Sequence, residues 1–126
     1  MNIGFEAKRV FHNKTGLGNY SRDLVRILSN YFPDNNYFLY NPKKNKKTLF
    51  VSNNTNVYER NPISKFNQKF KNYWRQNTVV KDLVKDEIVL YHGLSGELPS
   101  GLAKKGIKSI VTIHDLIFVR YPKLYS

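Results

Sequence analysis

Residues 3–28 read IGFEAKRVFHNKTGLGNYSRDLVRIL, and this stretch contains a strand, a loop and a helix in that order. The apolar run at residues 3–7 predicts a short buried strand. A polar loop with Gly16 and Gly18 follows it. Apolar side chains then recur at helical spacing, at Tyr20, Leu24, Ile27, Leu28 and Tyr31. This order predicts the first unit of an α/β sheet.

The rest of the chain continues the alternation of strands and helices. Strands are expected at residues 37–40, 48–52, 88–91 and 109–113, and a helix is expected from residue 63 to about residue 84. The connection at residues 53–56 is rich in asparagine and irregular. The strands are short and lack polar alternation, which indicates a parallel sheet buried on both faces. We therefore predict one Rossmann-like α/β domain over residues 1–126, with helices on both faces of the sheet.

Composition limits the class of protein. The 126 residues are 40% hydrophobic and include nine tyrosines and eight phenylalanines, enough for a folded core. Cysteine is absent, which excludes disulfides and thiolate metal sites. No apolar run approaches the roughly 20 residues of a membrane span, and the start does not resemble a signal peptide, so a cytoplasmic protein is expected. The formal charge of +12 favours anionic partners: phosphates, anionic lipid surfaces or nucleic acid.

Ligands of open parallel sheets bind beyond the carboxyl ends of the strands, so the loops there are the candidate sites. The first loop holds Gly16 and Gly18 before a helix, where backbone amides favour an anion or a sugar. The other two begin at His92 and at His114-Asp115. A histidine at such a position can bind a hydroxyl, or a phosphate when charged.

Each of these features also has a structural interpretation. The glycines could form an ordinary turn capped by Asn19 or Ser21, and each histidine could be satisfied by nearby backbone. The glycines also suggest the dinucleotide-binding fingerprint GxGxxG, but Ser21 stands at the position of its third glycine, which argues against dinucleotide binding. A metal site would need His12, His92, His114 and Asp115, and no pair of these residues has a recognised ligand spacing. Ser95 does not lie in the GxSxG elbow of a hydrolase.

Three stretches together resemble the N-terminal domain of glycosyltransferase family 4, especially its bacterial mannosyltransferase-like members. They are residues 3–28, LYHGLSGELP at 90–99 and KSIVTIHDLIFVRYP at 108–122. The resemblance covers about half of the chain and leaves out most of its middle. It implies a retaining enzyme of the GT-B fold, in which two Rossmann-like domains face each other across a cleft. The first domain binds mostly acceptor and the second mostly nucleotide sugar, and the transfer requires no metal or other cofactor.

The resemblance also implies roles for individual residues. Gly16, Leu17 and Gly18 would approach the diphosphate and the sugar of the donor. His114 would be the catalytic-site histidine that contacts the donor sugar, whereas His92, Asp115 and Arg9 would lie on the acceptor side.

The partners expected from the resemblance are a nucleotide sugar, with mannose or glucose as the sugar, and a glycan or lipid-linked acceptor. The family's carboxylate pair and its phosphate-binding Arg and Lys belong to a C-terminal domain that does not follow Ser126. We therefore expect this chain to be part of a longer enzyme and to be inactive alone. The alternatives are a stand-alone Rossmann-like module for a phosphorylated or anionic ligand, and a nucleic-acid-binding domain, which no RNA-binding signature supports.

The segment KFNQKFKNYWRQ, residues 65–76, is both basic and aromatic. Phe66, Phe70, Tyr73 and Trp74 recur at helical spacing between cationic residues. This pattern fits a helix lying on an anionic membrane surface, which would place the protein peripherally on the inner face of a membrane. It also fits a helix that buries its aromatic stripe in the core, which is the commoner arrangement.

Overall fold

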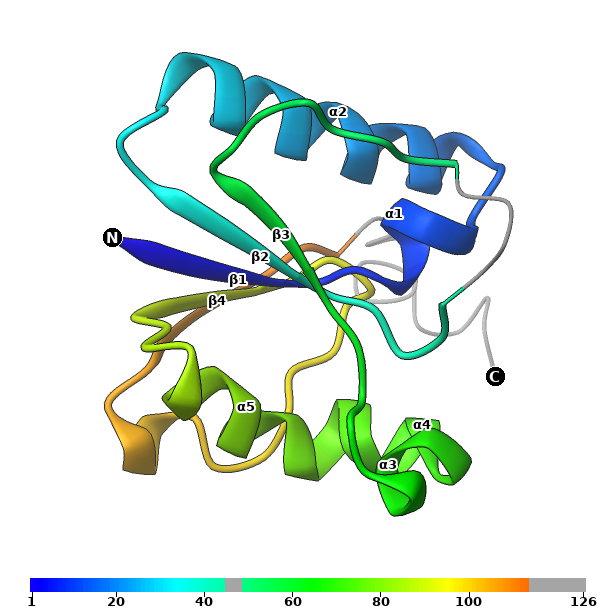
Figure 1. The fold of residues 1–126 in the computed structure, drawn as a ribbon, viewed down its shortest axis with the longest axis vertical. Coiled ribbons are helices and arrows are strands. Elements are labelled where there is room, and N and C mark those ends of the chain that lie inside the picture. The colour runs from blue at the N-terminus through cyan, green and yellow to red at the C-terminus, as the bar shows by residue number, and fades with distance from the viewer. Residues whose placement is uncertain (45–48, 114–126) are drawn as a thin grey trace, which may run out of the picture.

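The computed structural model describes residues 1–44 and 49–113 and contains a sheet of five parallel strands. The strands are β1 (Asn2–Glu6), β2 (Asn36–Tyr40), β3 (Val57–Arg60), β4 (Leu90–Gly93) and β5 (Lys108–Val111), in the order β3-β2-β1-β4-β5. The chain builds outward from β1 to β3, then crosses to β4 on the other side of β1 (Figure 1). The predicted Rossmann-like α/β fold is confirmed, and the order of the strands reverses between β1 and β4.

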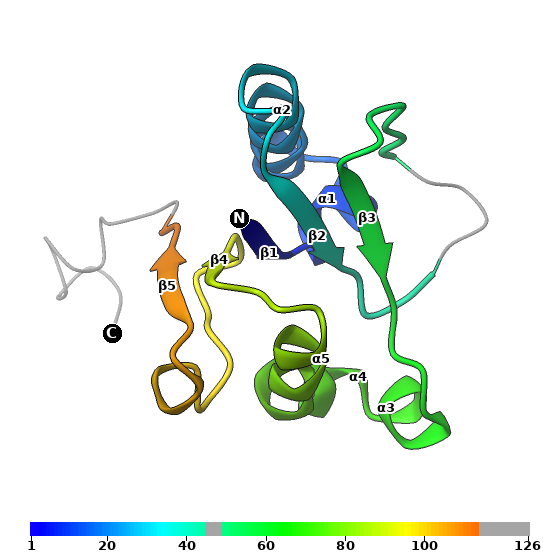
Figure 2. The ribbon, with the colours of Figure 1, turned by 60° about the vertical axis from the view of Figure 1, so that its left-hand side comes forward.

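Helices cover both faces of the sheet (Figure 2). One face carries α1 (Lys8–His12) and α2 (Gly16–Tyr31). The other carries α3 (Lys65–Lys69), α4 (Lys71–Tyr73), the π-helical turn η1 (Trp74–Thr78) and α5 (Val79–Lys85). A short 3₁₀ turn, η2 (Ala103–Lys105), leads into β5. No helix of the described ranges has the length and apolar character needed to cross a membrane.

Two hydrophobic cores form because neighbouring strand residues point to opposite faces. The core under α1 and α2 contains Ile3, Phe5, Tyr37 and Leu39 from the sheet and Val10, Phe11 and Val25 from the helices. The core under α5 contains Phe38, Tyr40 and Tyr91 from the sheet and Trp74, Val79 and Leu83 from the helices. β1 and β2 therefore lack polar alternation because both of their faces are buried.

A buried arginine joins α1 to α2. Arg22 Nη1 donates to the carbonyl oxygens of Asn13, at 2.7 Å, and Val10, at 3.2 Å, at the end of α1. Its Nη2 donates to Asn19 Oδ1 at 2.6 Å. A cation at a helix carboxyl end is favourable because the last carbonyls lack helical partners. This link fixes α1 beside the end of β1.

The expected strand at residues 48–52 is wrong for its described part, residues 49–52, and the third strand is β3. This apolar run packs into the core without joining the sheet: the Phe50 ring meets the Phe11 ring edge-on, with ring centres 5.9 Å apart. β3 lies at the sheet edge and pairs only with β2, so it can be polar. Its Tyr58 ring stacks on the Phe38 ring with ring centres 4.9 Å apart. The Arg60 guanidinium lies 5.1 Å from the centre of the Phe38 ring.

The core-facing interpretation of the aromatic segment is wrong for three of its four rings. Phe66, Phe70 and Tyr73 are 55%, 46% and 49% exposed, whereas Trp74 is buried at 1%. The expected helix is real but is interrupted at Phe70, whose φ of −106° and ψ of 65° end α3. The last two strands also begin later or end earlier than expected, since β4 starts at Leu90 and β5 ends at Val111.

Candidate functional site

A cavity of about 350 Å³ lies where β1 and β4 end, beside the point at which the strand order reverses. We call it the basic pocket. It is lined by Lys8, Arg9, His12, Asn13, Arg75, Ser95 and Glu97. These residues come from α1, from η1 and from the loop after β4, so three separate segments meet there. This is the edge of a parallel sheet at which ligands bind.

Glu6, the last residue of β1, organises one wall of the basic pocket. Its buried carboxylate accepts hydrogen bonds from the Ser95 hydroxyl, at 2.5 Å, and from the Lys8 backbone amide, at 3.1 Å. Arg75 Nε lies 3.3 Å from Glu6 Oε1. An isolated buried carboxylate would be strongly unfavourable, so the ion pair and the two hydrogen bonds explain how Glu6 is tolerated in an apolar strand.

Two guanidinium nitrogens in the basic pocket are buried without a hydrogen-bond partner among the described residues. They are Arg9 Nη1 and Arg75 Nε. Arg75 Nε is within ion-pair distance of Glu6, but the contact does not have hydrogen-bond geometry. A buried donor left unpaired costs about 1–3 kcal/mol, and more when it is charged. Each guanidinium therefore has an unused donor, which a turn of the side chain toward the basic pocket would bring to a ligand.

The charge of the basic pocket is positive. Its lining contains three cations, Lys8, Arg9 and Arg75, and one exposed carboxylate, Glu97. Glu6 is not among the lining residues. A neighbouring hollow of about 300 Å³ shares Lys8, His12 and Arg75 and adds Pro42, Lys43, Lys71 and Asn72. The positive charge therefore extends from the basic pocket toward α4.

His12 has a fixed orientation at the border of the two hollows. Its Nε2 lies 2.7 Å from the carbonyl oxygen of Lys43 and 2.8 Å from Asn41 Oδ1. Because a carbonyl can only accept, Nε2 carries the hydrogen and donates. This contact ties the end of α1 to the loop after β2.

The glycine pair occupies the first turn of α2, so the expectation of a loop before the helix is wrong at Gly16, Leu17 and Gly18. An added Cβ at Gly18 would lie 2.0 Å from the backbone oxygen of Asn13, whereas one at Gly16 would meet nothing within 4 Å. Gly18 is thus required by close packing, and Gly16 leaves open space. The expected cap is also different, because Asn13 Oδ1 accepts from the amides of Thr15, at 2.8 Å, and Gly18, at 3.3 Å.

His92 is the third residue of β4 and is half-buried. Its Nε2 is bonded to Thr112 Oγ1, and its ring lies 5.5 Å from that of Phe5. Burial lowers the pKa of the imidazole below its ordinary value of 6.5, so the ring is neutral at pH 7. His92 does not line the basic pocket, so the structure gives it a separate place from Arg9.

Arg9 is the predicted site residue that the structure brings into the basic pocket. His114 and Asp115 lie outside the described residues. Within residues 1–44 and 49–113, no group of three or more His, Asp or Glu side chains could hold a metal ion.

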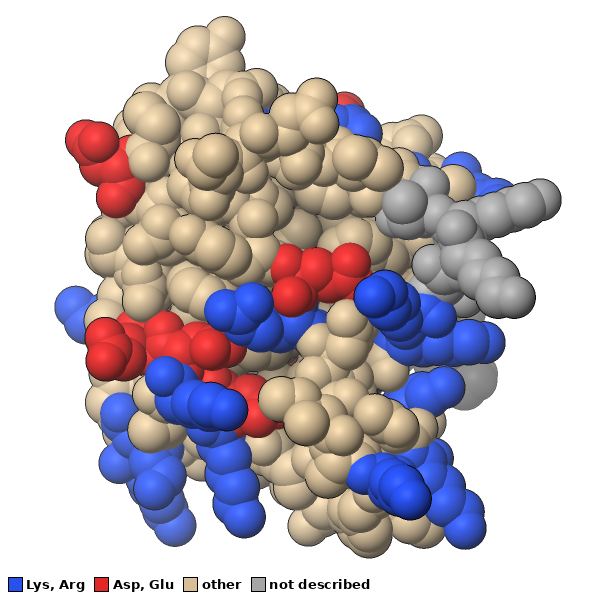
Figure 3. All heavy atoms as spheres, viewed as in Figure 1, with Lys and Arg blue, Asp and Glu red and all other residues tan. Residues whose placement is uncertain are grey.

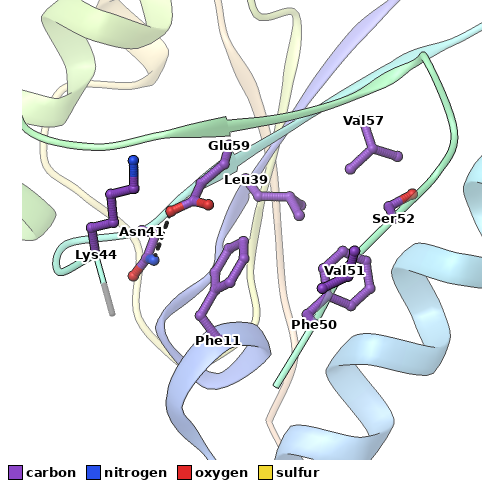
Figure 4. A pocket seen from close by; sticks show the side chains of 9 residues that line it. All are labelled: Phe11, Leu39, Asn41, Lys44, Phe50, Val51, Ser52, Val57 and Glu59. Carbon is purple, nitrogen blue, oxygen red and sulfur yellow. Dashed lines mark hydrogen bonds between the residues drawn. The ribbon is translucent and has the colours of Figure 1, made fainter. Parts of the chain in front are cut away.

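A second cavity, of about 330 Å³, lies between α1 and the β2–β3 edge of the sheet (Figure 4). Phe11, Leu39, Phe50 and Val57 give it apolar walls, and Asn41 and Glu59 lie at one end (Figure 4). The Glu59 carboxylate already accepts from the amides of Asn41, at 3.0 Å, and Asn61, at 3.1 Å. This cavity is lined by one cation, Lys44, and by the carboxylate of Glu59, whereas the basic pocket has three cations and is therefore the stronger candidate for an anion.

Sequence reasoning missed four residues of the candidate site: Glu6, Lys8, His12 and Arg75 were not placed in a common anion site. One signal was available, since Glu6 is a lone carboxylate within the apolar run IGFEA. A charge in a buried strand requires a partner. The identity of that partner, Arg75, depends on a tertiary contact 69 positions away.

Compared with protein-family models, curated proteins and solved structures, the chain matches none of them.

Proposed function

We propose that this chain is the acceptor-side domain of a retaining glycosyltransferase of the GT-B type, and that its basic pocket binds a phosphate group of a substrate. The donor would be a nucleotide sugar carrying mannose or glucose, and the acceptor a glycan or a lipid-linked sugar. The glycosyl-transfer part rests on the resemblance of residues 3–28, 90–99 and 108–122 to family 4. The phosphate-binding part rests on the geometry of the basic pocket.

The observation that carries the phosphate assignment is that two arginines lining one cavity each have a buried nitrogen, Arg9 Nη1 and Arg75 Nε, without a hydrogen bond to the described residues, although Arg75 Nε is ion-paired with Glu6. A guanidinium forms strong, directional hydrogen bonds with phosphate oxygens, and it stays charged at every relevant pH. The cavity volume of about 350 Å³ is at the lower end of the range for small-molecule sites. A phosphorylated ligand would satisfy both nitrogens and neutralise the local positive charge.

The same pocket also supports the alternative, a Rossmann-like module that binds an anionic ligand without transferring a sugar. Phosphate binding explains the arginines in either case, whereas transfer requires groups that hold an acceptor hydroxyl beside the donor. By resemblance, His114 is the residue that would contact the donor sugar, and His92, Asp115 and Arg9 would lie on the acceptor side.

Binding is tested by calorimetric titration of the chain with inorganic phosphate, UDP-glucose and GDP-mannose at about 150 mM salt. Arg9→Met should weaken binding of the occupying ligand at least about tenfold, because a charge-assisted hydrogen bond contributes about 1.5–3 kcal/mol. Lys81→Met is the matched control, since it removes one positive charge from an exposed position on α5. Arg75 is less suitable, because its loss would leave Glu6 buried without its cation.

Unchanged binding in Arg9→Met, or an equal loss in Lys81→Met, would reject the basic pocket as the phosphate site. Transfer is tested separately on the full-length natural protein, with labelled GDP-mannose or UDP-glucose and a lipid extract. Label should enter the lipid or glycan fraction, and His114→Ala should abolish this. Arginine-dependent binding without any transfer would favour the binding module.

A further inference from the structure

A contiguous apolar surface covers the outer side of α3 and α4. Ile63, Phe66, Phe70 and Tyr73 are 78%, 55%, 46% and 49% exposed. The rings contact each other, with Phe66 and Phe70 centred 4.8 Å apart and Phe66 and Tyr73 6.0 Å apart. With Lys65 and Lys69 we call this surface the aromatic-lysine patch. Single exposed apolar residues are ordinary, whereas three exposed rings in contact, with Ile63 exposed just before α3, indicate an interaction surface.

The inner side of the same segment is already anchored. Trp74 follows Tyr73 directly but is buried, and its Nε1 donates to Asp82 Oδ2 at 2.7 Å. The break at Phe70 and the π-helical turn η1 separate the aromatic side chains into an inner member and an outer cluster. The rings of the outer cluster, Phe66, Phe70 and Tyr73, are each about half exposed, and Figure 2 shows α3 and α4 in the helical layer on one face of the sheet. The segment therefore presents exposed rings outside the core, while Trp74 anchors it to the core.

The charge of this segment is entirely positive. Residues 60–81 contain six cations and no carboxylate, namely Arg60, Lys65, Lys69, Lys71, Arg75 and Lys81. Lys65 and Lys69 are exposed, and Lys69 Nζ lies 5.6 Å from the centre of the Phe70 ring. In the space-filling view, the part of the surface where α3 and α4 lie carries basic side chains and no acidic ones (Figure 3). Acidic residues lie elsewhere on this face, so the segregation is local.

We propose that the aromatic-lysine patch binds the surface of an anionic phospholipid membrane. The four apolar side chains would enter the boundary between headgroups and acyl chains, and the lysines would lie at the level of the lipid phosphates. Aromatic rings prefer this boundary, and each lysine near an anionic surface strengthens attachment. This inference concerns a different surface from the basic pocket and does not depend on the proposed function.

Other partners fit the patch less well. Lysine is depleted in protein interfaces, where aromatic residues are enriched, so a protein partner would have to bury unfavourable cations. Single-stranded nucleic acid stacks its bases on open ring faces. Here Phe66 and Tyr73 pack edge to face at 89°, and Ile63 offers no ring at all. A surface that inserts apolar groups and attracts phosphates matches a bilayer in both respects.

The test is flotation of the chain with vesicles of phosphatidylcholine alone or with about 30% phosphatidylglycerol. Because the chain carries +12, general attraction to anionic vesicles must be separated from insertion. Phe66→Ser with Phe70→Ser keeps every charge and should weaken binding at least about tenfold. Lys65→Gln with Lys69→Gln should weaken binding about fivefold for each lysine, and only with anionic vesicles.

The control is Tyr31→Ser with Phe32→Ser, which removes two exposed aromatic rings from the end of α2, in the opposite helical layer. It should bind vesicles like the unchanged chain, and circular dichroism should show all three variants to be folded. Equal vesicle binding by the phenylalanine variant and the control, or no binding to anionic vesicles at low salt, would overturn the proposal. So would a loss of oligonucleotide binding in the phenylalanine variant with vesicle binding intact, which would identify a nucleic-acid surface.

Discussion

Gly18 and Gly16 lie two positions apart in the first turn of α2, and substitution to alanine should affect them in opposite ways. At Gly18 the added Cβ would lie 2.0 Å from the Asn13 oxygen and 3.0 Å from Arg22 Nη1. Nonbonded C···O contacts are not shorter than roughly 3.3 Å, so the backbone must separate by more than about 1 Å. At Gly16 the new methyl group meets nothing within 4 Å.

The expected size of the two effects follows from these contacts. Overpacking costs typically 1–3 kcal/mol, and the obstacle at Gly18 is backbone, so Gly18→Ala should lower the free energy of unfolding by about 2 kcal/mol or more. For a chain of this size that corresponds to a Tm about 8 °C lower. Gly16→Ala should raise the free energy of unfolding by about 0.4–1 kcal/mol, because it restricts the unfolded chain at no steric cost.

Urea denaturation of both variants beside the unchanged chain is the assay. If Gly18→Ala proves as stable as the unchanged chain, the close approach of α1 and α2 at Asn13 is refuted. Gly16→Ala also separates packing from binding, since it should fold normally. Weaker binding of a nucleotide sugar by this stable variant would support the donor-loop role that the family resemblance gives Gly16.

Three further predictions concern stability. Because burial lowers the pKa of His92 below 6.5, the unfolded chain takes up a proton first, so stability should fall as the pH drops from 7 to 5. His92→Asn should remove that contribution, and an NMR titration midpoint above 6.5 for His92 would contradict it. Arg22→Leu should lower the free energy of unfolding by about 2–4 kcal/mol, since it leaves two carbonyls at the end of α1 without donors; a loss under about 1 kcal/mol in urea would count against this. Trp74→Phe should cost about 1–3 kcal/mol through the lost bond to Asp82, whereas a melting temperature equal to that of the unchanged chain would show the bond to be unimportant.

The fold was predictable where burial leaves a direct mark on sequence. β1, β2 and β4 lie inside the sheet and bury both faces, so their residues form short apolar runs. β3 was missed because an edge strand needs little apolar surface, and VYER does not read as buried. The run around Phe50 misled for the opposite reason, since a loop residue can fill the core between helices.

The candidate site was predictable only in position. The family resemblance pointed to Arg9, which lies in the basic pocket at the sheet edge that the strand-end rule selects. It did not lead to Arg75, which reaches the site from a π-helical turn on the other face of the sheet. Local sequence patterns cannot predict such a contact. It depends on which way the Arg75 side chain points after the helix break at Phe70 and the π-helical turn.

The aromatic-lysine patch and the basic pocket are two different surfaces, yet both receive side chains from the segment that contains Arg75. Tyr73 faces outward, Trp74 is buried in the core, and Arg75 reaches Glu6 at the end of β1. Three consecutive side chains thus point to the patch, the core and the basic pocket. Lys71, from the same segment, lines the hollow beside that pocket. The two proposals can still fail separately, because replacing Phe66 and Phe70 leaves every guanidinium in place and replacing Arg9 leaves every aromatic ring.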